Sequence, residues 1–285
     1  MSGIRQLLRG DNNYNFVRLW RIGVIASCVL VLAAVLSIAV RGMAWGIDFE
    51  GGTSWEVPTS DLGVGEARDV LRPFGLATAK IQTIGSNTLR VQAETSSDEE
   101  TSTVRTALAE AASVSPTDVA VTQVGPSWGG EISRKAVRAL IFFFIAIAVY
   151  ITLALREWRM AVGALVAVLH DIVISVGVYS VLQFEVTPAT VIAFLTILGF
   201  SLYDTVVVFS KLRENSAKFG LAGRMTYTEL ASVSTNQVLM RSINTSMTAL
   251  LPVISILVVG AFILGATTLE EFGLALLIGL IFGAY

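Results

Sequence analysis

Long, largely apolar runs constrain this chain more than any other feature of its sequence. The run from Ile22 to Val40 contains no charged residue, and at about 1.5 Å per helical residue it covers a hydrocarbon core about 30 Å thick. Four more such runs predict transmembrane helices over residues 137–155, 161–182, 190–209 and 238–263. A sixth run, residues 272–285, is too short to cross a bilayer, so we expect the chain to end inside its last helix. The predicted fold class is an α-helical polytopic membrane protein with six transmembrane helices, the last truncated.

The composition agrees with this class. Hydrophobic residues make up 54% of the chain and charged residues 15%, whereas soluble domains carry about 25% charged residues. A formal net charge of −2 gives no concentrated basic surface for nucleic acid, so the expected partner is the lipid bilayer. Cys28 is the single cysteine and His170 the single histidine. They exclude an internal disulfide and a multi-histidine metal site, and without a phosphate-binding loop pattern we expect no metal and no cofactor.

The distribution of basic residues predicts the orientation. Basic residues occur in residues 1–21, in the links after residues 155 and 209, and just inside the fifth predicted helix, at Arg5, Arg9, Arg18, Arg21, Arg156, Arg159, Lys211, Arg213, Lys218, Arg224 and Arg241. The links 183–189 and 264–271 contain no lysine or arginine. Because basic loops remain in the cytoplasm, we predict a cytoplasmic segment over residues 1–21, a first transmembrane helix over 22–40, and an extracytoplasmic domain over 41–134.

The region 41–134 has the pattern of a small α+β domain. Alternating apolar and polar residues predict strands over 54–57, 80–84, 88–92 and 119–124. Helical patterns over 65–74 and 98–112 lie between them, the second preceded by Ser97 as a helix cap. This order of elements predicts a ferredoxin-like domain between the first two transmembrane helices. Residues 135–285 hold the remaining helices.

Asp204 is the most informative polar residue in the apolar runs. A carboxylate at membrane depth costs about 2.5 to 3.5 kcal/mol and needs a partner, water or a proton. Counted from the ends of their helices, Asp204 and Arg241 have similar depths, so we expect that they can meet. Ion pairing keeps the acid ionised and separation raises its pKa, which is what a proton-coupled switch requires. A static ion pair, or an arginine that extends to the membrane surface, remains an alternative.

Asp171 is a second carboxylate inside an apolar run and a further candidate for proton coupling. We expect no relay between it and the adjacent His170, because neighbouring residues on a helix point about 100° apart. Serines in the runs have no base at a readable spacing, which disfavours a hydrolase. We therefore expect a transport subunit and no enzyme.

Four short motifs resemble the SecF family. They are Gly46-Ile47-Asp48-Phe49-Glu50-Gly51-Gly52 after the first helix, Val124-Gly125-Pro126 before the second, Asp204-Thr205-Val-Val-Val-Phe in the fourth, and Arg241-Ser-Ile-Asn244-Thr-Ser246 in the fifth. Each is weak alone, but their order and the helices between them match the family over essentially the whole chain. Locally, Gly51 and Gly52 predict a turn without side-chain bulk, and a plain tight turn is the alternative to a function.

The resemblance implies a function. SecF-like proteins are multi-pass proteins of the bacterial cell membrane that pair with SecD beside the Sec channel, SecYEG, and use the proton-motive force to promote translocation of preproteins. It implies proton passage through the positions of Asp204 and Arg241, with another acid from SecD. This chain differs from many members at two positions: they have Asn where it has Tyr203, and an acidic residue where it has Ser210.

Two other function classes remain open. A proton-coupled exporter of small molecules or lipids, of the resistance-nodulation-division type, would share the same proton chemistry. An assembly scaffold would tolerate neutral residues at positions 204 and 241.

Overall fold

The structure, a computed structural model, describes residues 14, 16–59, 61–85, 87–94, 97–220, 225–264 and 266–283. Arg5, Arg9, Arg224 and Tyr285, on which predictions of orientation and of the last helix rest, lie outside the described residues.

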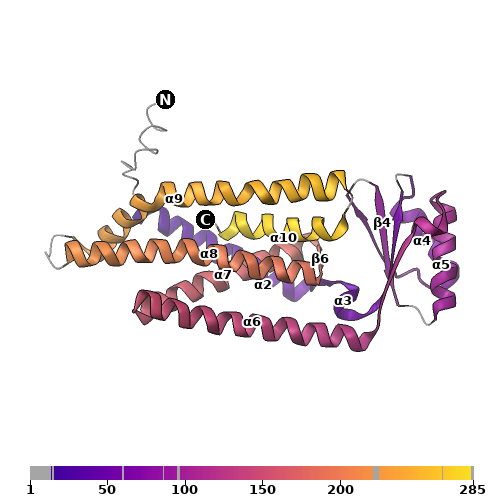
Figure 1. Cartoon of the computed structure of the whole chain (residues 1–285), viewed down its shortest axis with the longest axis horizontal. Coiled ribbons are helices and arrows are strands. Elements are labelled where there is room, and N and C mark those ends of the chain that lie inside the picture. The colour runs from indigo at the N-terminus through magenta and orange to yellow at the C-terminus, as the bar shows by residue number, and fades with distance from the viewer. Residues whose placement is uncertain are drawn as a thin grey trace, which may run out of the picture.

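Long helices lie side by side and carry a small sheet domain at one end (Figure 1). They are α2 (Phe16–Arg41), α6 (Pro126–Leu155), α7 (Trp158–Leu182), α8 (Pro188–Asn215), α9 (Tyr227–Ser255) and α10 (Thr267–Gly283), with π-helical segments η3 (Ser216–Gly220) and η4 (Ile256–Ile263). Most begin or end beyond the predicted ranges, because hydropathy marks only the apolar part of a helix. Among the residues that the structure describes, five helices, α2 and α6 to α9, are long and apolar enough to cross a membrane. The described part of α10 has 17 residues, so a sixth span stays a prediction.

Small residues let the helices pack closely. A Cβ atom added to Gly177 on α7 would collide with Ala34, which is the buried residue of α2. A Cβ added to Gly279 on α10 would likewise collide with Ile197 on α8. Close approach through small residues is a common way to join helices where apolar burial gives little driving force.

The sheet domain contains β2 (Gly52–Pro58), α4 (Val64–Leu71), η1 (Arg72–Phe74), β3 (Lys80–Ile84), β4 (Thr88–Ala93), α5 (Asp98–Ala111), η2 (Pro116–Asp118) and β5 (Ala120–Val124). The antiparallel strand order is β3-β4-β2-β5, with Trp55 opposite both Val91 and Val121. All four predicted strands are present. The predicted helix 65–74 is instead divided into α4 and η1, because Pro73 in the sequence cannot continue the α-helical hydrogen bonds.

The two faces of the sheet have different roles. Trp55 and Val91 are fully buried in the domain's own core, and α4 and α5 cover the face that is turned away from the long helices (Figure 1). Arg90 and Gln92 alternate with these residues and therefore lie on the opposite face. At the junction, β1 (Ala44–Trp45) pairs in parallel with β6 (Glu185–Val186), and the short helix α3 (Ile47–Glu50) leads into β2.

Candidate functional site

Asp204 lies at the contact between α8 and α9. Both of its carboxylate oxygens accept the hydroxyl of Ser242, at 2.6 and 2.8 Å. Asp204 is half-buried, so this membrane-helix carboxylate has a polar partner on the neighbouring helix. Ser242 belongs to the Arg241 motif, but no feature of the sequence identifies it as the partner of Asp204.

Arg241 has a different partner. Its Nη2 donates to the hydroxyl of Tyr203 at 2.5 Å, and its guanidinium carbon lies 5.6 Å from the centre of the Tyr203 ring. The direct contact expected between Asp204 and Arg241 is therefore absent: no ion pair joins these two described residues. Successive residues on a helix point about 100° apart, so Ser242 faces α8 while Arg241 turns toward the exposed side.

The two contacts nevertheless place the acid and the base at the same level of the bundle. Tyr203 bonds to Arg241 and the next residue, Asp204, bonds to the next residue of the other helix, Ser242. The similar depth expected for Asp204 and Arg241 agrees with this register.

The other polar motif residues of these helices bond along their own helix. Thr205 donates its hydroxyl to the carbonyl of Ser201 at 3.1 Å. Asn244 is exposed, and its carbonyl accepts the hydroxyl of Thr248 at 2.9 Å. Neither side chain contacts Asp204 in the described hydrogen bonds.

A second polar group crosses three helices. Asp171 on α7 accepts the hydroxyl of Ser201 on α8 at 2.5 Å and lies 3.0 Å from Nδ1 of His170. The other ring nitrogen of His170 contacts the hydroxyl of Ser27 on α2. The expectation that His170 and Asp171 do not interact was wrong, because rotation of the long imidazole side chain overcomes the different directions of the two Cβ atoms.

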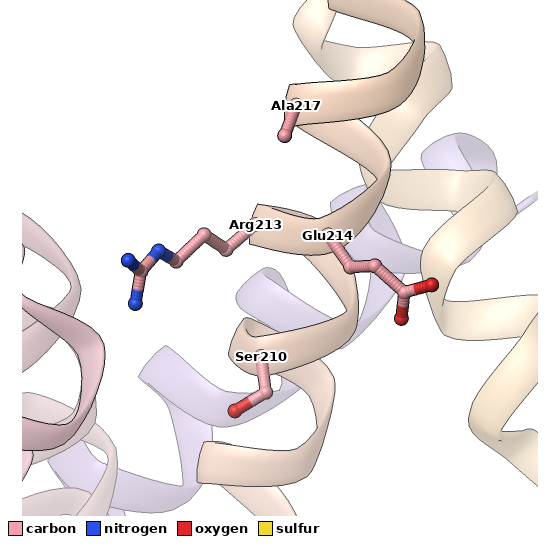
Figure 2. A pocket seen from close by; sticks show the side chains of 4 residues that line it. All are labelled: Ser210, Arg213, Glu214 and Ala217. Carbon is pink, nitrogen blue, oxygen red and sulfur yellow. The ribbon is translucent and has the colours of Figure 1, made fainter.

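Ser210, the second position that departs from the family pattern, lies apart from these groups. Figure 2 shows it beside a pocket that is also lined by Arg213 and Glu214, near the end of α8, and by Ala217 of η3. Arg213 and Glu214 point to different sides, and Glu214 accepts from Lys211 at 2.9 Å and Lys218 at 2.6 Å. Ser210 is exposed and is part of a charged helix end.

The glycine motif forms the junction between the bundle and the sheet domain. The amide of Gly46 donates to Val186 at 3.0 Å, and a Cβ atom added to Gly46 would lie 2.7 Å from a carboxylate oxygen of Glu185. The φ angles of Gly51 and Gly52 are 85° and 124°, a region that other residues rarely adopt. The predicted turn is therefore present, directly between α3 and β2.

Two other parts of the predicted motifs complete the junction. Phe49 packs its ring against Trp45 at 5.5 Å between ring centres. Gly125 caps α6 in an extended conformation, and Pro126 is the first helical residue, where proline costs no hydrogen bond.

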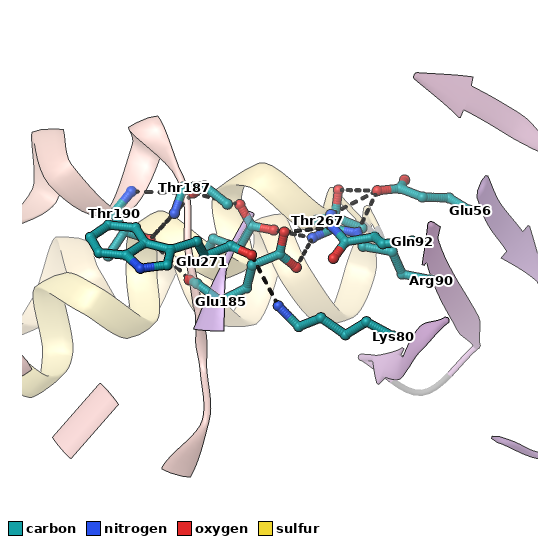
Figure 3. A network of polar contacts seen from close by, with 10 residues as sticks. Glu56, Lys80, Arg90, Gln92, Glu185, Thr187, Thr190, Thr267 and Glu271 are labelled. Carbon is teal, nitrogen blue, oxygen red and sulfur yellow. Dashed lines mark hydrogen bonds and ion pairs between the residues drawn. The ribbon is translucent and has the colours of Figure 1, made fainter. Parts of the chain in front are cut away.

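Next to this junction lies a charged cluster that the sequence did not reveal (Figure 3). Arg90 donates from Nε and Nη2 to Glu56 at 3.0 and 2.7 Å, and from Nη1 to Glu185 at 3.2 Å and Glu271 at 2.5 Å. The side chains of Arg90 and Glu185 are only 8% and 5% exposed. One guanidinium thus joins carboxylates from β2, β6 and α10. We call Arg90, Glu56, Glu185 and Glu271 the Arg90 cluster.

Neutral side chains complete the Arg90 cluster. Gln92 donates to Glu185 at 2.6 Å, Thr187 to Glu271 at 2.9 Å, and Thr267 to Glu56 at 3.3 Å. Every buried carboxylate of the cluster therefore has hydrogen-bond donors besides Arg90, as buried charge requires.

The cluster changes the titration of its surroundings. Burial alone would lower the pKa of Arg90, but its three glutamates outweigh burial and raise this pKa above the ordinary value. Burial lowers the pKa of the nearby Lys80, against the attraction of Glu185 and Glu50. Burial, reinforced by repulsion from Glu185, raises the pKa of Asp48.

The sequence indicates only part of the Arg90 cluster. Arg90 and Gln92 alternate with Leu89 and Val91, which predicts that they leave the core of the sheet domain. Nothing local indicates that this second face is covered by the link 183–189 and the start of α10.

Two family models match the chain. The model described as "Protein export membrane protein SecD/SecF, C-terminal" matches residues 103–285. The model described as "SecD/SecF GG Motif" matches residues 36–60, which contain Gly51 and Gly52.

Curated relatives named "Protein translocase subunit SecF" cover nearly all of the chain. The Mycobacterium tuberculosis relative is 40% identical over 100% of this chain and 66% of its own length. The Streptomyces coelicolor relative is 40% identical over 98% of this chain and 75% of its own length. The Escherichia coli O157:H7 relative is 31% identical over 98% and 86%. The chain thus spans about two thirds of the length of the mycobacterial relative.

Two solved structures are also similar. The crystal structure of SecDF, described as a translocon-associated membrane protein from Thermus thermophilus, matches 97% of this chain at 32% identity with a TM-score of 0.86. SecDF in a super-membrane-facing form matches 96% at 31% identity with a TM-score of 0.67. The match covers 37% of each solved chain. Together with the apolar helices, these similarities indicate a multi-pass membrane protein. One family model covers more than half of the chain, and relatives named SecF match almost all of it. The chain therefore belongs to the SecD/SecF family of protein export membrane proteins, and within this family it is similar to the SecF subunits.

Proposed function

We propose that this chain acts as a SecF subunit of a bacterial protein-export machinery and uses the proton-motive force to promote preprotein translocation. The proposal is carried by Asp204 and Arg241, which lie at one level of the α8 and α9 helices, each bound to a neutral polar side chain. An acid and a base that are close but not paired can change partners when a proton arrives.

The proton step follows from the chemistry of the partners. Ionised Asp204 accepts the hydroxyl of Ser242 at both oxygens, and a proton on Asp204 converts one of these oxygens into a donor. Ser242 then accepts a hydrogen bond from that oxygen instead of donating to it. This exchange of donor and acceptor alters the contact between α8 and α9 at the level where Arg241 binds Tyr203.

A SecD-like subunit is the proposed partner of this surface. Arg241 is exposed and Tyr203 is 48% exposed, although both belong to apolar helices. A cation facing hydrocarbon is costly, so a second subunit that brings an acid to Arg241 stabilises the assembly. The Sec channel, SecYEG, and the preprotein are the further proposed partners.

Asp171 is proposed to hold protons at a second position. Ser201 joins it to α8, and His170 joins it to Ser27 on α2. Its protonation therefore changes contacts among three helices, including the helix that carries Asp204.

The proposed topology places six spans in the bacterial cell membrane with the amino terminus in the cytoplasm. The sheet domain, proposed to be ferredoxin-like, lies outside and holds or releases the emerging preprotein. One proton moving through 100 mV supplies about 2.3 kcal/mol, which shifts a two-state equilibrium several tens of fold.

Asp204→Asn tests the proposal in vesicles that contain this subunit, a SecD-like subunit and the Sec channel. Translocation is measured with and without an imposed proton gradient. We expect the variant to assemble with its partners and to lose stimulation by the gradient, because an amide cannot take up the proton.

Glu214→Gln is the matched control. It removes a carboxylate from the same helix, but this one is exposed and paired with lysines, so gradient stimulation should remain. Full stimulation in Asp204→Asn would refute the proton role and favour an assembly scaffold.

A further inference from the structure

The contact between the sheet domain and the long helices is polar. The core of the domain includes Trp55, Val91 and Leu108, and every residue of this core or packed against it lies between residues 52 and 124. The helices have separate cores. Contacts between domains that lack a shared apolar core are typical of parts that move relative to each other.

The Arg90 cluster is the centre of this contact (Figure 3). Arg90 comes from β4 of the sheet domain, whereas Glu185 and Glu271 come from the link before α8 and from α10. Gln92 adds a second bond from β4 to Glu185. Charge on the two sides is complementary, with a cation on the domain facing two anions on the bundle.

The covalent connections between the two parts lie next to each other. The chain enters the domain at Gly51 and Gly52 and leaves it at Gly125. Gly52 is opposite Val124 in the sheet, so both crossings are at one place. A Cβ atom added to Gly129 on α6 would lie 2.5 Å from the carbonyl oxygen of Phe49, so α3 is packed on α6. The glycine crossings lie between this contact and the sheet domain.

We propose that the sheet domain turns as a rigid body about Gly51–Gly52 and Gly125, and that the Arg90 cluster is a breakable clasp that holds it in the position seen here. Loss of Arg90 leaves Glu185 and Glu271 close together without the cation that they share. The contact between the sheet domain and the helices is then less favourable, and the domain can turn away from the helices into an open position. The domain keeps its fold in the open position because its core contains no residue of the bundle. This inference concerns domain position and is independent of proton passage.

Arg90→Gln tests the clasp in the full chain in lipid nanodiscs. With Cys28 replaced by serine, cysteines at the exposed positions Ser102 on α5 and Ser255 on α9 carry spin labels. The distance between the labels is then measured by pulsed electron resonance. We expect one narrow distribution for the parent and a broader one that extends to longer distances for Arg90→Gln.

Arg72→Gln is the matched control, since Arg72 is an exposed arginine of the same domain, 68% exposed in a pair with Asp69. It should leave the distribution unchanged. A second pair of labels at Ser102 and Gln123 lies within the domain and should keep its distance in Arg90→Gln. The proposal is disproved if the distances between Ser102 and Ser255 stay narrowly distributed in Arg90→Gln. It is also disproved if the distances between Ser102 and Gln123 broaden in that variant.

Gly125→Pro tests the hinge in the Arg90→Gln background. The φ of −70° and ψ of 146° at Gly125 suit proline, so the substitution stiffens one crossing without strain. We expect it to narrow the distribution that Arg90→Gln broadens. An unchanged broad distribution would place the movement elsewhere.

Discussion

At the scale of residues, the neutral neighbours of charged groups decide which contacts form. Asp204 and Arg241 do not pair with each other. Asp204 accepts a hydrogen bond from Ser242, the neighbour of Arg241, and Arg241 donates one to Tyr203, the neighbour of Asp204. Tyr203 provides both a hydroxyl and a ring to the guanidinium, which Asn, the residue of many SecF-like proteins at this position, cannot do. This position is therefore expected to set how tightly Arg241 is held.

Asp48→Asn is predicted to raise the thermal midpoint of unfolding at neutral pH. The pKa of Asp48 is raised by burial and by Glu185, so the ionised acid costs stability in the folded protein. The gain should be present above the raised pKa, shrink as the pH falls through it, and vanish below the ordinary value of 3.8. Thermal unfolding of purified protein followed at several pH values measures the difference.

Asp69→Asn is the control for this prediction. Its carboxylate is 67% exposed in a pair with Arg72, and such exposed pairs contribute at most about 1 kcal/mol. No gain at neutral pH is expected there. A gain for Asp48→Asn that persists at the lowest pH would contradict the electrostatic explanation.

At the scale of elements, α2 packs mainly against α7. Only Ala34 of α2 is buried, and it lies against Gly177 of α7. The hydroxyls of Ser37 and Ser180 add a bond of 2.9 Å between the same helices. The first helix is thus attached to the bundle where small side chains let the two backbones approach.

Gly177→Ala is predicted to lower the stability of the protein by about 1 to 3 kcal/mol, because an added methyl group must push α2 away from α7. Gly199→Ala is the matched control within α8, where an added Cβ atom meets nothing within 4 Å. It should be neutral or stabilising by up to about 1 kcal/mol, since alanine favours helices. Denaturant unfolding in detergent compares them, and equal effects would argue against the packing explanation.

At the scale of the whole molecule, two parts with separate cores meet through charges. The helices and the sheet domain meet at the Arg90 cluster and are connected through the glycine crossings. Neither part requires an apolar residue of the other for its own core.

A fragment of residues 52–124 is therefore predicted to fold alone. Trp55 is the only tryptophan in it and is fully buried, so its fluorescence reports the core. We expect blue-shifted emission and one cooperative unfolding transition in urea. Emission typical of exposed tryptophan would show that the domain needs the bundle.

The sequence predicted local features well. Apolar runs indicated the long helices, and alternation indicated all four strands, because burial imposes periods of 3.6 and 2 on helices and strands. Ser97 was predicted as a helix cap, and its hydroxyl accepts the amide of Glu100 at 3.2 Å. The glycine turn was predicted too, since few residues tolerate positive φ.

The sequence by itself determined which segments are helices and strands, where the chain turns, and which polar residues enter apolar helices, because these depend on neighbours along the chain. Only the tertiary structure decided that Asp204 bonds to Ser242, that Arg241 rests on Tyr203, and that Arg90 joins Glu185 and Glu271. These partners lie 38 to 181 positions apart. Their meeting depends on how helices rotate against each other and on how the sheet sits at their end, and no local pattern encodes either.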